Sequence, residues 1–570
     1  MTARGMDNPA SGNFLGLYEK VAPAFAPPRT PFSLIEMPPG VGKTVNYVMG
    51  SILHQARLGK SLFIPDVKCE LAPMLVGALR DMGIEVWCIN PAGAHKDLCG
   101  DTPLNLYQAV VDAAHAPDSS RQDAIKLAFD LAELHLPESK GGEDRNVYFR
   151  NGSRRCIAIA ILSQALSDPA HCTPSDVFAL LNDPSVFQKR LLFLRFELER
   201  LLPGDPIAQF LKTEAGGLLS LFRDNPENAS SFLEGATQRL LTFNQGGRMA
   251  GYGRAASHNI ADMRHRQIVA FVMAPLSHAR EFAPVVSLLT HSLLEAAKRK
   301  PSGHPVHIVG EEALNFRFAD LASDMETMRG LKISADLYIQ SFDGLIRKYG
   351  REAASAIESY CDVKIYAGLN SLARAKHVSD MLAESTIRRQ DYSFRAEVSD
   401  INVSSRELGR RLMTPDEVLA MDRDKAWVFV RGLRPVLLTM VDYGRISPWQ
   451  TEVADNPLEG ATLSGESLFA IRYSADAKPQ LDRKRRPKSK TDHRFVWPVR
   501  PKHLLWLPLV LALLLIDPSI IPTPHMRFAG TYSSTSADPY FHHCDYFGLH
   551  SRRISPPDGR CPIIAFLTSF

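Results

Sequence analysis

One short stretch of this sequence limits its fold more than any other: residues 37–44 read MPPGVGKT. A strand-like run, Ser33 to Met37, leads into it, and a helix-like run begins at Val45. At such a junction successive backbone N–H groups wrap phosphates, and the helix N-terminus adds its positive end. Lys43 is expected to meet the β- and γ-phosphates of a nucleotide, and the Thr44 hydroxyl to bind Mg²⁺.

The first half of this loop departs from the usual pattern. Met37 stands where Gly is usual, and Pro38 and Pro39 lack N–H groups. The alternative to nucleotide binding is a mere Gly-rich turn, but GxGKT between a strand and a helix is rare by chance. We predict that ATP is bound by the second half of the loop, namely Gly40, Val41, Gly42, Lys43 and Thr44.

A pair of acids, Glu311 and Glu312, follows another strand-like run, His307 to Gly310. A nucleotide hydrolase of this kind needs one carboxylate for the Mg²⁺ shell and another to polarise the attacking water. Either Glu311 holds the metal and Glu312 the water, or Glu311 polarises water and the metal carboxylate is lost. The non-catalytic alternative is a pair of acids that begins a helix, where they suit its dipole.

Gln340 lies at the end of the next strand-like run, ADLYIQS (residues 335–341). A Gln there can contact the γ-phosphate or its water and sense hydrolysis. Taken alone, a Gln at a strand end is more often an ordinary loop residue.

Strand-like and helix-like runs alternate on both sides of a long helical stretch. Further strand-like runs are SLFIPD (61–66), EVWCINP (85–91), IVAFVMAP (268–275), VKIYAGL (363–369) and AWVFVRG (426–432). This alternation predicts an α/β fold with a mostly parallel sheet, a RecA-like P-loop NTPase. From 101 to 262 apolar residues recur at helical spacing, so we expect an all-α domain inserted between residues 31–100 and 263–450 of the nucleotide-binding domain.

The two ends of the chain differ from its middle. Residues 1–30 are a weakly patterned lead-in without a secretory signal, and residues 451–502 are a polar, basic linker. Residues 503–521 contain the uncharged run LLWLPLVLALLLI, and basic residues crowd its upstream side, as on the cytoplasmic side of a membrane segment. We expect a C-terminal membrane segment there, the alternative being a buried helix, and a poorly ordered tail over 522–570.

Charge and cysteine content exclude little by themselves. The net charge is +4, with 66 basic and 62 acidic residues, too balanced to indicate nucleic-acid binding. No two of the eight cysteines are spaced as CxxC, so no zinc ribbon or redox motif is visible. The first six are expected to be reduced thiols, whereas Cys544 and Cys561 could pair if the tail lies in an oxidising compartment.

The order of these motifs resembles the type IV secretion coupling proteins, the TraG-like conjugative DNA-transfer ATPases, which belong with the FtsK-like and HerA-like motors. FIPDVKCE (63–70) is similar to that family's Asp-Pro-Lys-Gly-Glu strand end, with Val67 and Cys69 departing. The strongest stretch runs from Glu311 to Lys376, and LMTPDE (412–417) and VRGLRP (430–435) close the pattern.

This resemblance implies a homo-hexameric, ATP-driven motor that recruits DNA or a DNA–relaxase complex to a type IV secretion channel. It also implies the bacterial inner membrane as location, with the motor facing the cytoplasm, and Arg329 as the arginine that completes a neighbouring subunit's site. Two alternatives stay open: a divergent nucleotide-binding adaptor with little hydrolysis, and a cytosolic helicase-like or defence ATPase of the same superfamily.

Overall fold

A computed structural model provides the structure of the protein. It describes residues 12–117, 119–138, 146–244, 246–247, 249, 258–311, 321–394, 401–460, 463, 465–473, 523–533, 540–547, 552–556, 560 and 564–567. The chain divides into two units, Met1–Leu481 and Asp482–Phe570. Each unit is described by itself.

The first unit is built on an 11-stranded sheet with the order β2-β1-β13-β12-β9-β3-β8-β7-β4-β6-β5. From β9 to β5 every neighbouring pair is parallel. The predicted α/β fold with a mostly parallel sheet is therefore confirmed. The parallel strands are β3 (Phe32–Glu36), β4 (Ser61–Asp66), β5 (Glu85–Ile89), β6 (Ile268–Met273), β7 (Val306–Gly310), β8 (Ile333–Ile339) and β9 (Val363–Tyr366).

Both faces of the parallel sheet are covered, as continuous apolar strands require. Along β3 Leu34 packs into one core cluster and the next residue, Ile35, into another. The Ile35 side is covered by α1 (Met49–Arg57) and α2 (Leu71–Asp81). The Leu34 side is covered by α12 (Ala279–Arg299), α13 (Leu321–Met328), α14 (Phe342–Tyr349) and α15 (Arg351–Tyr360).

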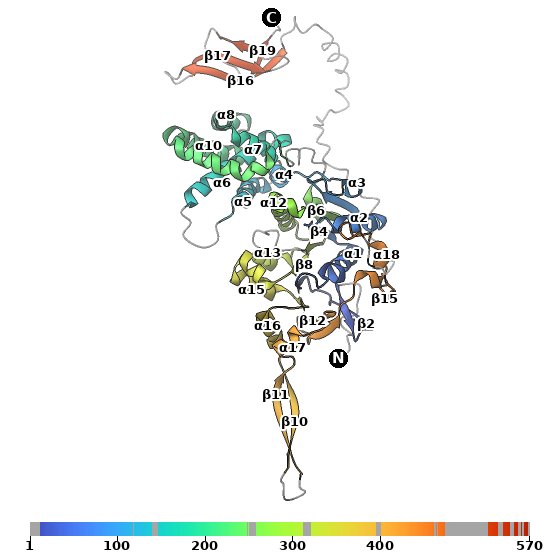
Figure 1. Cartoon of the computed structure of the whole chain (residues 1–570). Coiled ribbons are helices and arrows are strands. Elements are labelled where there is room, and N and C mark those ends of the chain that lie inside the picture. The colour runs from blue at the N-terminus through green and yellow to red at the C-terminus, as the bar shows by residue number, and fades with distance from the viewer. Residues whose placement is uncertain are drawn as a thin grey trace. The chain divides into compact units, whose positions relative to one another are not determined.

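The chain between β5 and β6 forms a helical bundle (Figure 1). At its centre lies α6 (Val147–Ser167), in which every residue from Cys156 to Leu166 is buried. Its neighbours start at an Asp, Asn or Thr that caps the helix and is followed by Pro, a strong local start signal. They are α7 (Pro174–Asn182), α8 (Pro184–Phe196), α10 (Pro206–Asp224) and α11 (Pro226–Leu240). The remaining α-helices of the bundle are α4 (Gln108–Ala114), α5 (Asp123–His135) and α9 (Leu198–Leu201), whereas the short α3 (Lys96–Cys99) lies beside α2 (Figure 1).

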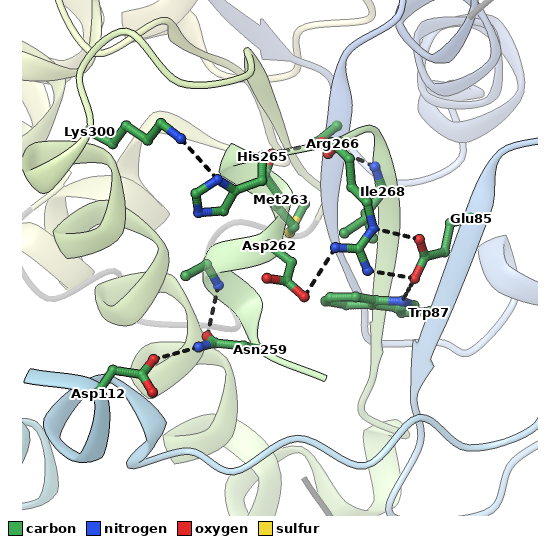
Figure 2. A network of polar contacts seen from close by, with 12 residues as sticks. Glu85, Trp87, Asp112, Asn259, Asp262, Met263, His265, Arg266, Ile268 and Lys300 are labelled. Atoms are coloured by element: carbon green, nitrogen blue, oxygen red, sulfur yellow. Dashed lines mark hydrogen bonds and ion pairs between the residues drawn. The ribbon is translucent and has the colours of Figure 1, made fainter. Parts of the chain in front are cut away.

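A polar network ties the end of this bundle to the edge of the sheet (Figure 2). Asn259 donates to Asp112 of α4 over 2.6 Å and caps the 3-10 turn Ile260–Arg264. Arg266, just before β6, forms two hydrogen bonds to Glu85 of β5 and lies over the Trp87 ring. The return of the chain from helices to sheet is therefore fixed by side chains as well as by the β5–β6 pairing.

Two parts of the first unit were not expected from the sequence. The predicted lead-in contains β1 (Phe14–Tyr18) and β2 (Ala22–Phe25), which extend the sheet beyond β12 (Lys425–Val430) and β13 (Val436–Thr439). After α16 (Leu372–Leu382), β10 (Glu384–Phe394) and β11 (Ile401–Arg411) pair along their whole length as a two-stranded ribbon (Figure 1). The short elements α17 (Pro415–Leu419), β14 (Ile446–Ser447), α18 (Trp449–Glu452) and β15 (Phe469–Ala470) complete this unit.

The second unit contains a four-stranded antiparallel sheet where the sequence predicts a poorly ordered tail. Its strands are β16 (Thr523–Ser533), β17 (Tyr540–Phe547), β18 (Arg552–Ile554) and β19 (Ile564–Leu567). The Ser, Pro and His content of the tail is typical of poorly ordered segments, so the sequence did not predict this sheet. Aromatic residues recur along β17, and Cys544 is buried and disulfide-bonded, the kind of staple that small domains use. Its expected partner, Cys561, lies outside the described residues, whereas Cys69, Cys88, Cys99, Cys156, Cys172 and Cys361 are free.

The predicted membrane segment, residues 503–521, and the basic part of the linker, 483–502, also lie outside the described residues. Within the part of the chain that the structure describes, no helix combines the length and apolar character needed to cross a bilayer.

Candidate nucleotide site

The loop after β3 takes a conformation that only its glycines permit easily. Gly40 and Gly42 have φ angles of 79° and 85°, in the left-handed region that other residues rarely adopt. The Asn46 side chain then donates to the Gly42 carbonyl over 2.8 Å. A π-helical turn begins at Thr44 and continues into α1, so the loop opens directly onto a helix N-terminus. This is the strand–loop–helix geometry predicted for a phosphate-binding loop.

The start of the loop shows why its unusual residues are tolerated. Met37 is fully buried in the core beneath α1, and its N–H donates to the Ile339 carbonyl over 3.0 Å. Met37 therefore continues the pairing of β3 with β8 instead of opening the loop. A methyl group at Gly368, just after β9, would meet the Val41 side chain at 2.7 Å. The loop thus packs closely against the strand on its other side.

The most informative contact of the site joins Thr44 to Glu311, which are 267 residues apart in sequence. The Thr44 hydroxyl donates to a Glu311 carboxylate oxygen over 2.6 Å. Glu311 directly follows β7 and is only 5% exposed. The structure therefore brings together the two side chains that the sequence proposes for Mg²⁺. Glu312 lies outside the described residues.

Other carboxylates surround Glu311. Burial raises the pKa of Glu311 to about 7; the Thr44 hydroxyl opposes this, and the nearby charges of Glu70 and Asp66 add to it. Burial likewise raises the pKa of Asp66 to about 6, against hydrogen bonds from backbone N–H groups. Asp66 ends β4 and accepts hydrogen bonds from the N–H groups of Glu70 and Ala72, so it orders the start of α2. This concentration of buried acids is suited to a cation.

Gln340 follows the last residue of β8, at the same edge of the sheet as the phosphate-binding loop. On one side of it, the Ile339 carbonyl accepts from Met37; on the other, the Phe342 N–H donates to Glu36 over 3.1 Å. The turn that carries Gln340 is therefore tied at both ends to the end of β3.

Arg329 lies at the opposite edge of the sheet. It precedes β8, so the seven residues of that strand, about 23 Å at 3.3 Å per residue, separate it from Gln340. Its guanidinium donates to both oxygens of Asp362, at 2.9 and 2.8 Å, and its side chain is 49% exposed. The structure does not bring Arg329 to the phosphate-binding loop of its own chain.

The sequence alone did not assign a role to two residues near the loop, Asp66 and Arg374. The FIPDVKCE stretch that contains Asp66 supports the resemblance but predicts no role for Asp66, although an Asp at a strand end beside another buried acid is a signal for a cation site. Arg374 falls within the stretch of resemblance from Glu311 to Lys376 without a role of its own, yet its guanidinium donates to Glu36 directly before the loop. Nothing in the spacing of 36 and 374 indicates that pair.

The family model described as Type IV secretory system Conjugative DNA transfer matches residues 5–457. The chain belongs to this family. VirD4 of Rhizobium radiobacter is 22% identical over 433 residues, which cover 72% of this chain and 57% of that protein. The chain thus spans somewhat more than half the length of this relative.

Solved structures of the coupling protein TrwB share the fold of this chain. The bacterial conjugative coupling protein TrwBdeltaN70 in its unbound monoclinic form superposes with a TM-score of 0.55 at 14% identity, covering 77% of this chain and 90% of that one. TrwB in complex with ADP and Mg²⁺ gives a TM-score of 0.52 at 13% identity, covering 73% and 87%. The expected P-loop NTPase fold and the resemblance to the coupling proteins are confirmed.

Proposed function

We propose that this coupling-protein family member is an ATP-driven motor that moves DNA, or a nucleoprotein or protein substrate, into a type IV secretion channel. The observation that carries the proposal is the 2.6 Å contact between Thr44 and Glu311, because it joins the phosphate-binding loop to a strand-end acid. Nucleotide hydrolysis needs these two elements side by side.

The residues at this contact suit Mg²⁺. A hydroxyl and a carboxylate are hard oxygen ligands, the kind this ion prefers, and Asp66 and Glu70 add negative charge nearby. We assign Thr44 and Glu311 to its shell, which leaves Glu312 to polarise the attacking water. Held by these residues, Mg²⁺ would supply positive charge to offset the negative charge that develops on the phosphates.

The nucleotide is proposed to be ATP. Backbone N–H groups from Gly40 to Thr44 would hold the β- and γ-phosphates, and the Lys43 ammonium would neutralise them. Lys43 is only 8% exposed, so its charge acts in a protected site. TrwB complexed with ADP and Mg²⁺, a protein of the same fold, supports this choice. Gln340, tied to the loop on both sides, would contact the γ-phosphate or its water.

A ring of six copies is proposed because the resemblance to the conjugative DNA-transfer ATPases implies one. Arg329 lies too far from the loop of its own chain, and in such a ring it would act on the nucleotide of the neighbouring copy and stabilise transition-state charge. The helices within 101–262 would form the domain that meets the substrate. The partners would be DNA or a DNA–relaxase complex and the components of the secretion channel.

We also propose that the chain is held at the bacterial inner membrane by residues 503–521, with the motor in the cytoplasm. The apolar run and its basic upstream flank support this orientation. The disulfide at Cys544 supports it independently, because disulfides persist in oxidising compartments, whereas the six cysteines of the first unit are free.

A second candidate function is a nucleotide-binding adaptor with little hydrolysis. The observation in its favour is the start of the loop, where Met37 is buried and Pro38 and Pro39 offer no N–H. ATP turnover by the purified chain, with and without single-stranded DNA, separates the two functions, with Lys43→Ala as the control. The motor predicts turnover that DNA stimulates and Lys43→Ala abolishes; the adaptor predicts nucleotide binding without turnover.

A further inference from the structure

A buried ionic network lies directly behind the phosphate-binding loop. Arg374, on α16, donates to one oxygen of Glu36 through two nitrogens, at 2.9 and 2.6 Å, and to Glu358 of α15 at 2.7 Å. Arg374 and Glu358 are each 8% exposed, and Glu36 is 2% exposed. Such a network requires every charge to be paired, because an isolated buried charge is costly.

The aromatic residues around Arg374 fix the plane of its guanidinium. Its central carbon lies 4.2 Å from the centre of the Phe342 ring and 5.5 Å from that of Tyr366. The Tyr366 hydroxyl donates to Glu358 over 2.8 Å. Burial disfavours the charge of Arg374, but the carboxylates of Glu36 and Glu358 outweigh it and hold the pKa of Arg374 above its ordinary value. Lysine, with one compact ammonium group, cannot make all these contacts at once.

The second oxygen of Glu36 connects this network to the site. It accepts the Phe342 N–H over 3.1 Å, two residues after Gln340. Glu36 itself is the last residue of β3, immediately before Met37. Arg374 thus sets the side chain of Glu36, and Glu36 holds the backbone on which Gln340 is carried.

We propose that Arg374 is a positioning residue for hydrolysis: through Glu36 and the Phe342 N–H it holds the turn that carries Gln340 against the phosphate-binding loop. The proposal rests on the proposed function, since it assigns Gln340 to the γ-phosphate or its water. A merely structural ion pair would affect how stably the chain folds but not the turnover of each folded molecule.

A mutant cycle separates these two roles. ATP turnover and the affinity for a non-hydrolysable ATP analogue are measured for the full chain, Arg374→Lys, Gln340→Ala and the double variant. We expect Arg374→Lys to lower kcat by about 10- to 100-fold, the effect of a small misplacement, with little change in KM or analogue affinity. In the double variant kcat should match that of Gln340→Ala, because two residues that act through one step are not additive.

Arg266→Lys is the matched control. Arg266 also pairs with a carboxylate through two nitrogens and lies over an aromatic ring, but at the β5–β6 edge (Figure 2). The Arg266→Lys variant should turn over ATP at the same rate as the unaltered chain. If Arg374→Lys does not fold, Glu36→Ala takes its place in the cycle, because it removes the carboxylate that links Arg374 to the Phe342 N–H while Arg374 stays paired with Glu358.

The outcomes distinguish this inference from the proposed function. An unaltered kcat in Arg374→Lys, or losses that multiply in the double variant, would overturn the role of Arg374 while the motor stands. If the unaltered chain turns over ATP no faster than Lys43→Ala, the proposed function fails, and the role of Arg374 fails with it.

Discussion

The hydroxyl of Thr44 donates to the carboxylate of Glu311 over 2.6 Å, across 267 residues of sequence. The contact forms because β3 and β7 are parallel strands of one sheet, separated only by β8, so their carboxyl ends meet at the same edge. Helices inserted between β5 and β6 lengthen the separation in sequence without moving these strand ends apart.

Replacement of Lys43 is the first test of the site. Lys43→Ala removes a positive charge from the phosphates, and we expect ATP turnover to fall to background. The chain should stay folded, because Lys43 lies in the loop and contributes no core side chain. Lys189→Ala, at an exposed position on α8, is the control and should turn over ATP normally. Equal activity in both variants would contradict the assignment of the loop.

The two acids should give different defects. Glu311→Gln removes a Mg²⁺ ligand, so the variant should need much more Mg²⁺ for nucleotide binding and should lose turnover. Glu312→Gln should bind Mg²⁺ and ATP normally but hydrolyse ATP about 10²- to 10⁴-fold more slowly, the usual contribution of a polarising base. Titration of Mg²⁺ at fixed ATP analogue measures the first defect. Exchanged phenotypes would assign Glu311 to water and Glu312 to the metal.

The raised pKa of Glu311, about 7 against an ordinary 4.5, makes stability depend on pH. Between these values the folded chain holds a proton that the unfolded chain has released. The free energy of unfolding should therefore fall as pH rises from about 4.5 to 7, by about 3 kcal/mol from this group at 1.36 kcal/mol per pKa unit. Denaturant unfolding without nucleotide at pH 5 and pH 8 measures it. In Glu311→Gln the free energy of unfolding should lack this part of its decrease with pH. If the decrease is the same as in the unaltered chain, it comes from Asp66 or another group.

Sequence reasoning selected side chains at the ends of strands, and the structure places these strand ends at one edge of the sheet. Thr44, Glu311 and Gln340 each follow a short apolar run, and parallel pairing places the ends of such runs together whatever lies between them. Arg374 could not be assigned in this way. Its pairing with Glu36 depends on how α16 packs against β9 and β12, and helix packing is not encoded in a local motif.

The missed strands have a similar explanation. β1 and β2 are short and pair at the antiparallel edge, where only a few residues alternate and the turn residues Glu19 and Lys20 take left-handed φ angles. In β10 and β11 charged and polar residues interrupt the apolar pattern, so the ribbon has no clear period of two. In both cases the strands are defined by their partners more than by their own composition.

Replacement of Arg329 tests the proposed ring of copies. Arg329 is half exposed, and its buried partner Asp362 keeps a second cation, Arg431, at 3.1 Å, so Arg329→Ala should still fold and yet turn over ATP far more slowly. Neither Arg329→Ala nor Lys43→Ala should be active alone. Mixed rings contain sites with an intact loop facing an intact Arg329, so mixing the two variants should restore part of the activity. No recovery in mixed rings, shown to be mixed by two affinity tags, would contradict a role for Arg329 in the neighbouring copy.

The last prediction concerns the second unit. Its cysteine Cys544 is disulfide-bonded, while the six cysteines of the first unit are free, and an uncharged run within 503–521 lies between these two sets of cysteines in the sequence. If that run crosses the inner membrane, the sheet formed by β16 to β19 lies on the oxidising side, and the disulfide should form only there. Cells are first treated with a permeant alkylating agent that blocks free thiols. The protein is then unfolded, reduced and labelled with a maleimide polymer, which should add two labels per chain.

In cells without the thiol oxidase of that compartment the labels should be lost. In cells of which only the outer envelope is opened, protease should cut a tag placed at the C-terminus. Two labels that persist without the oxidase, or a tag that is cut only after lysis, would place the second unit in the cytoplasm and contradict the proposed topology.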